Sequence, residues 1–402
     1  MRARGRRPVS VVAAITLGVA GATLAVTSGS PLWGAVRAAV VLLVAMGVAW
    51  TQGLGARVAG WSALCAGLLT LPVAGVIAGD ALVRGSSLRG VAAAVTALGA
   101  ATLLAAATIG LIRASRGWRR WLALPVALVL VQFVVVPLAM GALATNRAPA
   151  PLGDRTPGDV GLVVEEVVLE GDGVQLAGWY VPSDNGVGVL LLHGSGSTRS
   201  SVLTHAQVLA GLGYGVLMVD ARGHGESTGT AMDLGWWGDA DIAPAVDYLL
   251  SRHDVTVDRV AVVGLSMGGE QALTAAATDE RIVAVVAEGV GVRVAGDVPP
   301  GRDDGWLPRA VNAWGTTVTD FLTSASPPAP LDEAVAAIGP PRRALIIAGL
   351  GEGAEARWLA ESSPGTVAVW EVPDAGHTAA LRTHPEEWRR RVAELLASAF
   401  GA

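Results

Sequence analysis

Residues 259–278 read RVAVVGLSMGGEQALTAAAT. The apolar, Val-rich run 259–265 predicts a buried strand, and residues 267–278 predict a helix. Between them, Gly264 and Gly268 flank Ser266 in a G-x-S-x-G pattern, whose glycines allow the sharp turn that exposes a serine hydroxyl above a sheet. Ser266 is therefore the candidate nucleophile.

Short Val-, Leu- and Ile-rich runs alternate with helical patterns on both sides of this stretch. This alternation predicts a mostly parallel eight-stranded sheet with helices on both faces and reactive groups at the carboxyl ends of its strands. The expected strands are 162–170, 176–182, 188–193, 214–220, 259–265, 282–287, 344–348 and 366–372. The expected helices are 200–212, 237–252, 267–278, 354–361 and 385–400.

A serine hydroxyl needs a base that takes its proton. His377 follows the last predicted strand, which is where the chain order of serine, acid and histidine places that base. His384 is the second candidate, although it directly precedes Pro385 and looks like the start of a helix. We expect His377 to be the general base.

A carboxylate should orient the imidazole and stabilise its charged form. Glu352 follows the strand predicted at 344–348, and Glu355 lies one helical turn further on. Glu288, at the end of the preceding strand, is a competitor. Glu352 is the first choice, and Glu288 and Glu355 stay open as alternatives.

Backbone N–H groups must stabilise the oxyanion that develops in acyl transfer. The amide of Met267, next to the candidate nucleophile, is one expected donor. The other is the amide of Ser195, in the glycine-rich loop that follows the strand predicted at 188–193.

Taken together, these motifs resemble the α/β-hydrolase superfamily, close to its monoacylglycerol-lipase and serine-aminopeptidase-like members. The resemblance rests on His193-Gly194, the segment 220–227 (DARGHGES), the turn at Ser266, and Gly376-His377. It implies a structural role for the 220–227 loop, so His224 receives no catalytic role. Most relatives have Asp where this chain has Glu352, which is one reason why the other two acids stay open.

The first 150 residues differ in composition from the rest. They hold 13 arginines and one acid, Asp80, whereas the remaining residues carry a formal charge of −17. A membrane span needs about 20 apolar residues, and five stretches reach that length: 9–28, 32–50, 58–79, 88–112 and 121–143. We expect a transmembrane helical domain at 1–144, a linker at 145–159 and the hydrolase domain at 160–402. The first span also fits a signal peptide.

The arginines predict the orientation of these spans. With five spans, nine arginines near the span ends face the cytoplasm and three face the other side, which follows the positive-inside rule. The protein is then expected in the plasma membrane, with the hydrolase domain outside the cytoplasm and the lipid bilayer as a partner. Arg37, in the second span, is expected to extend towards the interface.

An insertion at 290–341 separates two predicted strands. Trp306, Leu307, Trp314, Phe321 and Leu322 make it partly apolar. In the resembled fold such insertions form a lid or cap over the site, and this is the expectation here.

These features predict a serine hydrolase, of esterase or lipase type rather than peptidase, that cleaves a small-molecule or lipid ester through an acyl-enzyme on Ser266. No cofactor or metal is expected. The acidic domain lacks a basic cluster, which argues against a nucleic-acid partner. An acyltransferase with the same three residues, or a non-enzymatic membrane sensor, remains an alternative because fold alone does not determine function.

Overall fold

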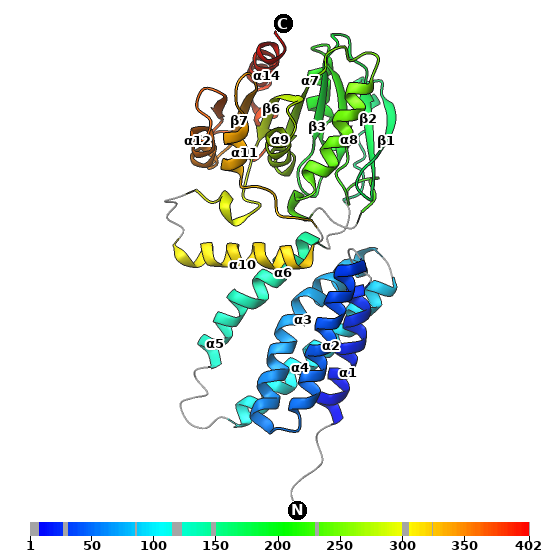
Figure 1. The fold of residues 1–402 in the computed structure, drawn as a ribbon, viewed down its shortest axis with the longest axis vertical. Coiled ribbons are helices and arrows are strands. Elements are labelled where there is room, and N and C mark those ends of the chain that lie inside the picture. The colour runs from blue at the N-terminus through cyan, green and yellow to red at the C-terminus, as the bar shows by residue number, and fades with distance from the viewer. Residues whose placement is uncertain are drawn as a thin grey trace, which may run out of the picture. The chain divides into compact units, whose positions relative to one another are not determined.

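The computed structural model describes residues 8–26, 31–84, 87–114, 123–145, 150–229, 233–299, 305–323 and 325–401; Figure 1 labels their helices and strands. The contacts divide the chain into two compact units. Unit 1 comprises Met1–Arg147 and Trp306–Ser324, and unit 2 comprises Ala148–Gly305 and Ala325–Ala402.

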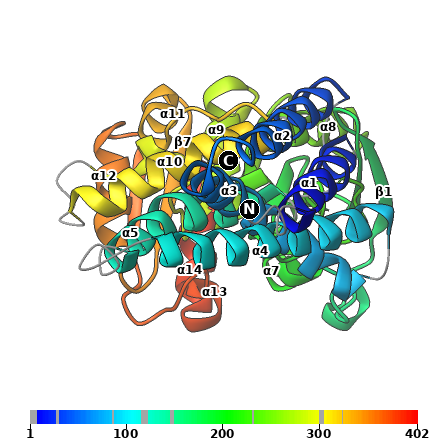
Figure 2. The same cartoon turned by 90° about the horizontal axis from the view of Figure 1, so that it is seen from below.

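Unit 1 is helical. The helices α1, α2, α3 and α4 pack as neighbours in the pairs α1–α2, α3–α4 and α1–α4 (Figure 2). Their shared core is rich in alanine, including Ala14, Ala66 and Ala100; such small side chains let helix backbones approach closely. The bounds are α1 Pro8–Val26, α2 Pro31–Thr51, α3 Ala56–Arg84 and α4 Leu88–Ala114.

The fifth apolar stretch forms α5 (Ala123–Leu130), a π-helical turn (Val131–Val135) and α6 (Val136–Thr145). Pro137 accounts for the wider turn before it, because a proline lacks an N–H and its ring clashes with the carbonyl four residues back. The helix therefore continues past this point with a local change of hydrogen bonding.

Three helical stretches of the described residues are long and apolar enough to cross a membrane: Arg57–Gly79, Leu88–Arg113 and Leu128–Thr145. This is fewer than the five spans expected from the sequence. Two shorter apolar segments, Ala13–Thr23 and Ala35–Thr51, lie within α1 and α2. The arginines before residue 8, those at 116–120, and Arg147 lie outside the described residues.

Unit 2 is built on one eight-stranded sheet with the order β1-β2-β4-β3-β5-β6-β7-β8. Strand β2 runs antiparallel to both of its neighbours, and the pairs from β4 to β8 are parallel. Each predicted strand is present. The strands are β1 Glu165–Glu170, β2 Gln175–Val181, β3 Gly188–Leu192, β4 Gly215–Val219, β5 Val260–Leu265, β6 Ile282–Glu288, β7 Arg343–Ala348 and β8 Val367–Glu371.

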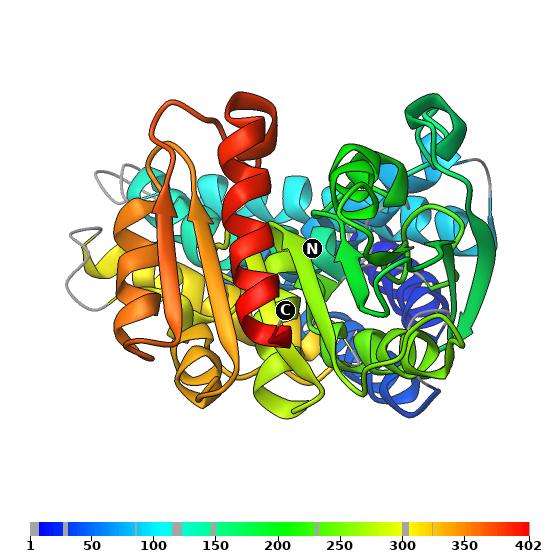
Figure 3. The same ribbon diagram turned by 90° about the horizontal axis from the view of Figure 1, so that it is seen from above.

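Helices cover both faces of this sheet. One face packs against α7 and α14, and the other against α8, α9, α11 and α12, so that two separate hydrophobic cores form. Figure 3 shows α14, in red, running alongside the strands. The bounds are α7 Leu203–Ala210, α8 Gly238–Ser251, α9 Met267–Thr278, α11 Leu331–Ala337, α12 Gly353–Glu361 and α14 Pro385–Phe400. The sequence did not predict α11 or the short α13 (Ala380–Thr383).

The predicted lid insertion, 290–341, is divided between the two units. Its central helix, α10 (Trp306–Leu322), packs against α6 and belongs to unit 1, whereas the flanking segments belong to unit 2. A lid role therefore stays a prediction. Arg37 also differs from expectation: it is buried, and its Nη1 donates to the carbonyl of Leu322 at 3.0 Å.

One buried histidine predicts a pH dependence of stability. His205 of α7 packs edge-on against Trp388 with ring centroids 5.3 Å apart, and neither of its ring nitrogens hydrogen-bonds to any residue that the structure describes. Burial lowers the pKa of His205 to about 4, below the value of about 6.5 for an exposed histidine. The unfolded chain therefore binds the extra proton between these pH values, and folding stability falls as pH falls through this window.

A His205→Phe variant is expected to lose less stability than the wild type between pH 6.5 and about 4, by up to about 1.4 kcal/mol per pH unit. Thermal unfolding of the detergent-solubilised full chain at several pH values measures this difference. His253→Ala is the matched control, because the His253 side chain is 88% exposed. Equal slopes for wild type and His205→Phe would contradict the prediction.

Candidate active site

Ser266 lies at the turn between β5 and α9, where it is the N-cap residue with φ 53° and ψ −120°. A non-glycine residue with positive φ is uncommon and is strained. Gly264 is required beside it, because a Cβ at that position would overlap the carbonyl of Gly268. The amide of Ser266 donates to the carbonyl of Glu288 at 2.7 Å, which ties the turn to β6. The local geometry is thus that of a strained, partly exposed serine at a strand end.

Three of the predicted side chains form one hydrogen-bonded chain. His377 Nε2 lies 3.0 Å from Ser266 Oγ, and His377 Nδ1 lies 2.6 Å from Glu352 Oε1. A carboxylate only accepts, so Nδ1–H donates to Glu352 and Nε2 is left to accept the serine proton. The His377 side chain is 57% exposed, so the described residues leave the imidazole open to solvent.

Glu352 is held from two sides. Its Oε2 accepts from the amide of Gly349 at 2.7 Å while Oε1 contacts His377. The loop that carries it is bonded to the loop that carries the histidine, since the amide of Leu350 donates to the carbonyl of Ala375 at 2.8 Å. These bonds orient the carboxylate towards Nδ1.

The other candidate acids lie elsewhere. Glu288 is buried, its Oε1 accepts from the amide of Ala380 at 2.8 Å, and its Oε2 accepts from Trp388 Nε1 at 3.3 Å. Burial raises the pKa of Glu288. Glu355 lies in the first turn of α12. The carboxylate within hydrogen-bond distance of His377 is that of Glu352, and His384, the second candidate base, instead contacts Asp374 at 2.9 Å.

The loop predicted to supply an oxyanion donor lies against the serine. A Cβ at Gly194 would come within 3.3 Å of Ser266 Cβ, and Met267 is the first residue of α9. No contact tests the amides of Met267 and Ser195 as oxyanion donors, so these roles stay predictions.

Two buried histidines hold this loop through hydrogen bonds to backbone groups. His193 Nε2 accepts from the amide of Ala221 at 3.0 Å while Nδ1 contacts the carbonyl of Gly194 at 2.8 Å. His224 Nε2 accepts from the amide of Gly196 at 3.2 Å. Burial, followed by the nearby His224, lowers the pKa of His193 to about 3, so it is neutral at pH 7 and can keep accepting. His224 thus has the structural position that the resemblance implies.

Two further residues shape the site and were not singled out from the sequence. Gly289 has φ +69°, and a Cβ there would come within 2.9 Å of His377 Cε1. Buried Glu270, in the first turn of α9, accepts from the amide of Gly291 at 2.8 Å and lies 3.6 Å from Arg293 Nε. Together they hold the loop after β6 against the imidazole. The sequence signal that could have pointed to Gly289 is a glycine two residues after the strand predicted at 282–287.

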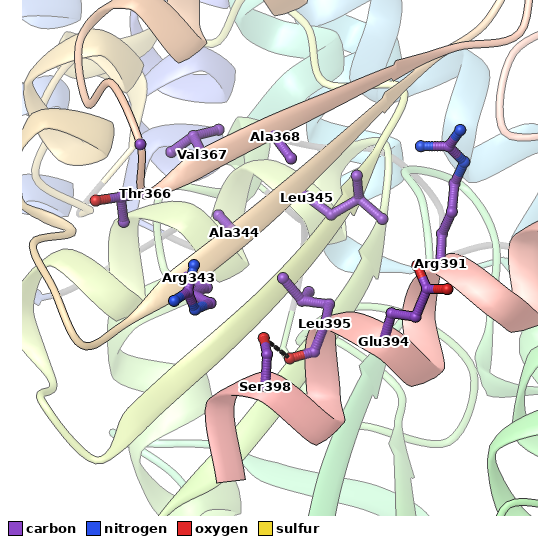
Figure 4. Close-up of a pocket in the computed structure, with 11 residues that line it drawn as sticks. Arg343, Ala344, Leu345, Thr366, Val367, Ala368, Arg391, Glu394, Leu395 and Ser398 are labelled. Carbon is purple, nitrogen blue, oxygen red and sulfur yellow. Dashed lines mark hydrogen bonds between the residues drawn. The ribbon is translucent and has the colours of Figure 1, made fainter. Parts of the chain in front are cut away.

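A separate hollow of about 400 Å³ lies at the amino ends of β7 and β8, beside α14 (Figure 4). Arg343, Val367, Arg391 and Leu395 are among its lining residues. Glu352 follows the opposite, carboxyl end of β7. The hollow therefore contains none of the predicted site residues.

Comparison with known proteins gives a partial match. Residues 185–336 match the family described as serine aminopeptidase, S33; this range contains Ser266 but not Glu352 or His377. An uncharacterized protein of Mycobacterium tuberculosis is 37% identical over 112 residues, which is 27% of this chain and 39% of that protein. The putative hydrolase YtaP of Bacillus subtilis is 41% identical over 86 residues, 18% of this chain and 29% of that protein. The chain thus spans less than half the length of these relatives.

Among solved structures, an esterase of Pyrococcus furiosus aligns with a TM-score of 0.51 and 23% identity. The alignment covers 62% of this chain and 97% of that one. At this identity the likeness concerns the fold of unit 2.

Proposed function

We infer that residues 160–402 of this chain belong to the α/β-hydrolase superfamily. From this premise we propose that the protein is a membrane-anchored serine hydrolase that cleaves a carboxylic ester. The observation that carries the proposal is the chain of contacts from Ser266 Oγ through His377 to Glu352, at 3.0 and 2.6 Å. A structural role alone gives no reason for a strained, partly exposed serine that hydrogen-bonds to an imidazole.

The chemistry follows from this chain of contacts. Ser266 Oγ attacks the ester carbonyl while its proton passes to His377 Nε2, and the Glu352 carboxylate stabilises the resulting imidazolium. The amides of Met267 and Ser195 stabilise the oxyanion. Collapse of the tetrahedral intermediate breaks the ester C–O bond, and His377 returns the proton to the leaving alcohol. Water, deprotonated by the same imidazole, then hydrolyses the acyl-enzyme and restores Ser266.

Labelling with a fluorescent phosphonate tests the nucleophile. Membranes that contain the wild-type protein are expected to show a labelled band, because the activated Oγ displaces the leaving group of the probe and forms a stable P–O bond. Ser266→Ala is expected to abolish the band, whereas Ser201→Ala, an exposed serine outside the site, leaves it. An unlabelled wild type, or equal labelling of Ser266→Ala, would overturn the proposal.

The membrane anchor is the second part of the proposal. It is supported by the three apolar helices of spanning length. We further propose that α1 and α2 also span, which makes five spans, and the arginine bias of the loops then favours unit 2 outside the cytoplasm. An alkaline-phosphatase reporter, active only outside the cytoplasm, is expected to be active when fused after Leu143. A cytoplasmic reporter such as β-galactosidase, active at the same fusion point, would contradict this sidedness.

A further inference from the structure

Helix α10 has a wide apolar side. Leu307, Trp314 and Phe321 recur every seven residues and so lie along one line of the helix, and Val311 and Val318 form an adjoining line. The opposite side carries polar residues, among them Asn312, Thr316 and Asp320. The helix is therefore amphipathic, and two apolar lines lie next to each other.

One of these lines is packed within unit 1. Val311, Gly315 and Val318 are buried, and α10 contacts α6. The approach is close, since a Cβ at Gly141 of α6 would come within 3.0 Å of Val318. At the carboxyl end of α10, the Arg37 guanidinium of α2 donates to the Leu322 carbonyl, a favourable place for a cation. Helix α10 is thus held on the helical unit at its side and at its end.

The side chains of the other line are exposed. Trp314 is 47% exposed and Phe321 45%, with Leu307 at 37%, and Trp306 at the start of the helix is 74% exposed. Two tryptophans and a phenylalanine on one helix form an exposed apolar surface of the kind that marks a contact with another apolar phase.

The residues around α10 indicate which apolar phase its exposed side contacts. The helix α6, on which it packs, belongs to the candidate span Leu128–Thr145, and Met140 and Leu143 of α6 are themselves 52% exposed. Apolar side chains exposed on a membrane span face lipid. Tryptophan is enriched where the hydrocarbon meets the headgroups, and an amphipathic helix lies in that plane with its apolar side buried about 5–10 Å deep.

We propose that α10 lies in the bilayer interface at the end of the α6 span, with Leu307, Trp314 and Phe321 in the lipid and Asp320 in water. The inference rests on the membrane anchoring proposed above and goes beyond it. Because α10 lies in the chain between β6 and β7, the middle of the hydrolase sequence is brought back to the bilayer. This arrangement fits a membrane-resident amphiphilic ester better than a freely soluble one.

Site-directed spin labelling tests the position of α10. Cys65 is the single cysteine, so a Cys65→Ser chain accepts one nitroxide at a time through Trp314→Cys, Asp320→Cys or Met140→Cys. The full chain is reconstituted in vesicles of phosphatidylcholine and phosphatidylglycerol. Collision rates of the nitroxide with lipid-soluble oxygen and with a water-soluble nickel chelate are then measured.

The ratio of oxygen to nickel collisions is expected to be several-fold higher at position 314 than at position 320, and to resemble that at position 140. A low ratio at 314 would overturn the inference. Low collision rates with both reagents at 314 would also overturn it, because a protein surface would then cover the residue, either a second copy or another part of the chain. A low ratio at 140 as well would instead reject the membrane anchoring. Unchanged thermal unfolding in detergent establishes that each variant is folded.

Discussion

A His377→Ala variant is expected to lose about 10⁶-fold in kcat towards a short-chain p-nitrophenyl ester, as much as Ser266→Ala loses. In the proposed mechanism the two side chains act as one unit, since the hydroxyl attacks only if Nε2, 3.0 Å away, takes its proton. The double variant Ser266→Ala/His377→Ala is therefore expected to be no slower than either single variant. Steady-state kinetics of the detergent-solubilised full chain measures all three.

His384→Ala is the matched control for this prediction. The His384 imidazole contacts Asp374 rather than Ser266, so kcat is expected to stay near that of the wild type. Losses that multiply in the double variant would show that the two residues act independently. A large loss in His384→Ala together with an active His377→Ala would exchange the two histidines.

A Glu352→Gln variant is expected to lower kcat by about 10⁴-fold, with little change in KM. The amide of Gly349 donates to one carboxylate oxygen at 2.7 Å, so the single oxygen of glutamine is expected to stay with that donor. The NH₂ group then faces His377 Nδ1 and donates to it. This forces the proton onto Nε2, where the imidazole can no longer accept from Ser266. The variant tests the tautomer while the shape of the side chain stays almost unchanged.

Glu288→Gln and Glu355→Gln separate the three acids. The Glu288 carboxylate accepts hydrogen bonds from Ala380 and Trp388. Its replacement is therefore expected to lower thermal stability and to change kcat by less than about tenfold. Glu355→Gln is expected to leave kcat near the wild-type value. If Glu288→Gln removed activity while Glu352→Gln kept it and both unfolded at the wild-type temperature, Glu288 would be the acid of the mechanism.

The strands of unit 2 and the turn at Ser266 could be predicted because their signals are local. Strands covered on both faces appear as continuous Val, Leu and Ile runs, and β3 to β6 are buried along their whole length. The turn at Ser266 needs only glycines at fixed offsets, because the backbone of Gly268 closes on Gly264. Such patterns depend on neighbours along the chain.

The choice among the three acids could not be made from local sequence signals. Glu288 is the last residue of β6 and Glu352 follows β7, and both strands end at the same edge of the sheet, so their sequence contexts are alike. The bonds from Gly349 to Glu352 and from Leu350 to Ala375 bring one carboxylate to His377, while Ala380 and Trp388 hold the other. These partners are distant in sequence or set by loop geometry, so the sequence could put Glu352 first but could not exclude Glu288.

The position of α10 likewise depends on tertiary contacts and not on local sequence signals. The sequence predicted a partly apolar insertion but not its helix, and an apolar helix side fits a lid, a membrane helix or a bilayer surface equally well. The close approach at Gly141 and the bond from Arg37 to Leu322 assign it to the helical unit. The chain therefore encodes Ser266, its strand and its helix in adjacent residues. The acid beside His377 and the partner of α10 depend on contacts between distant segments, which exist only once the chain has folded.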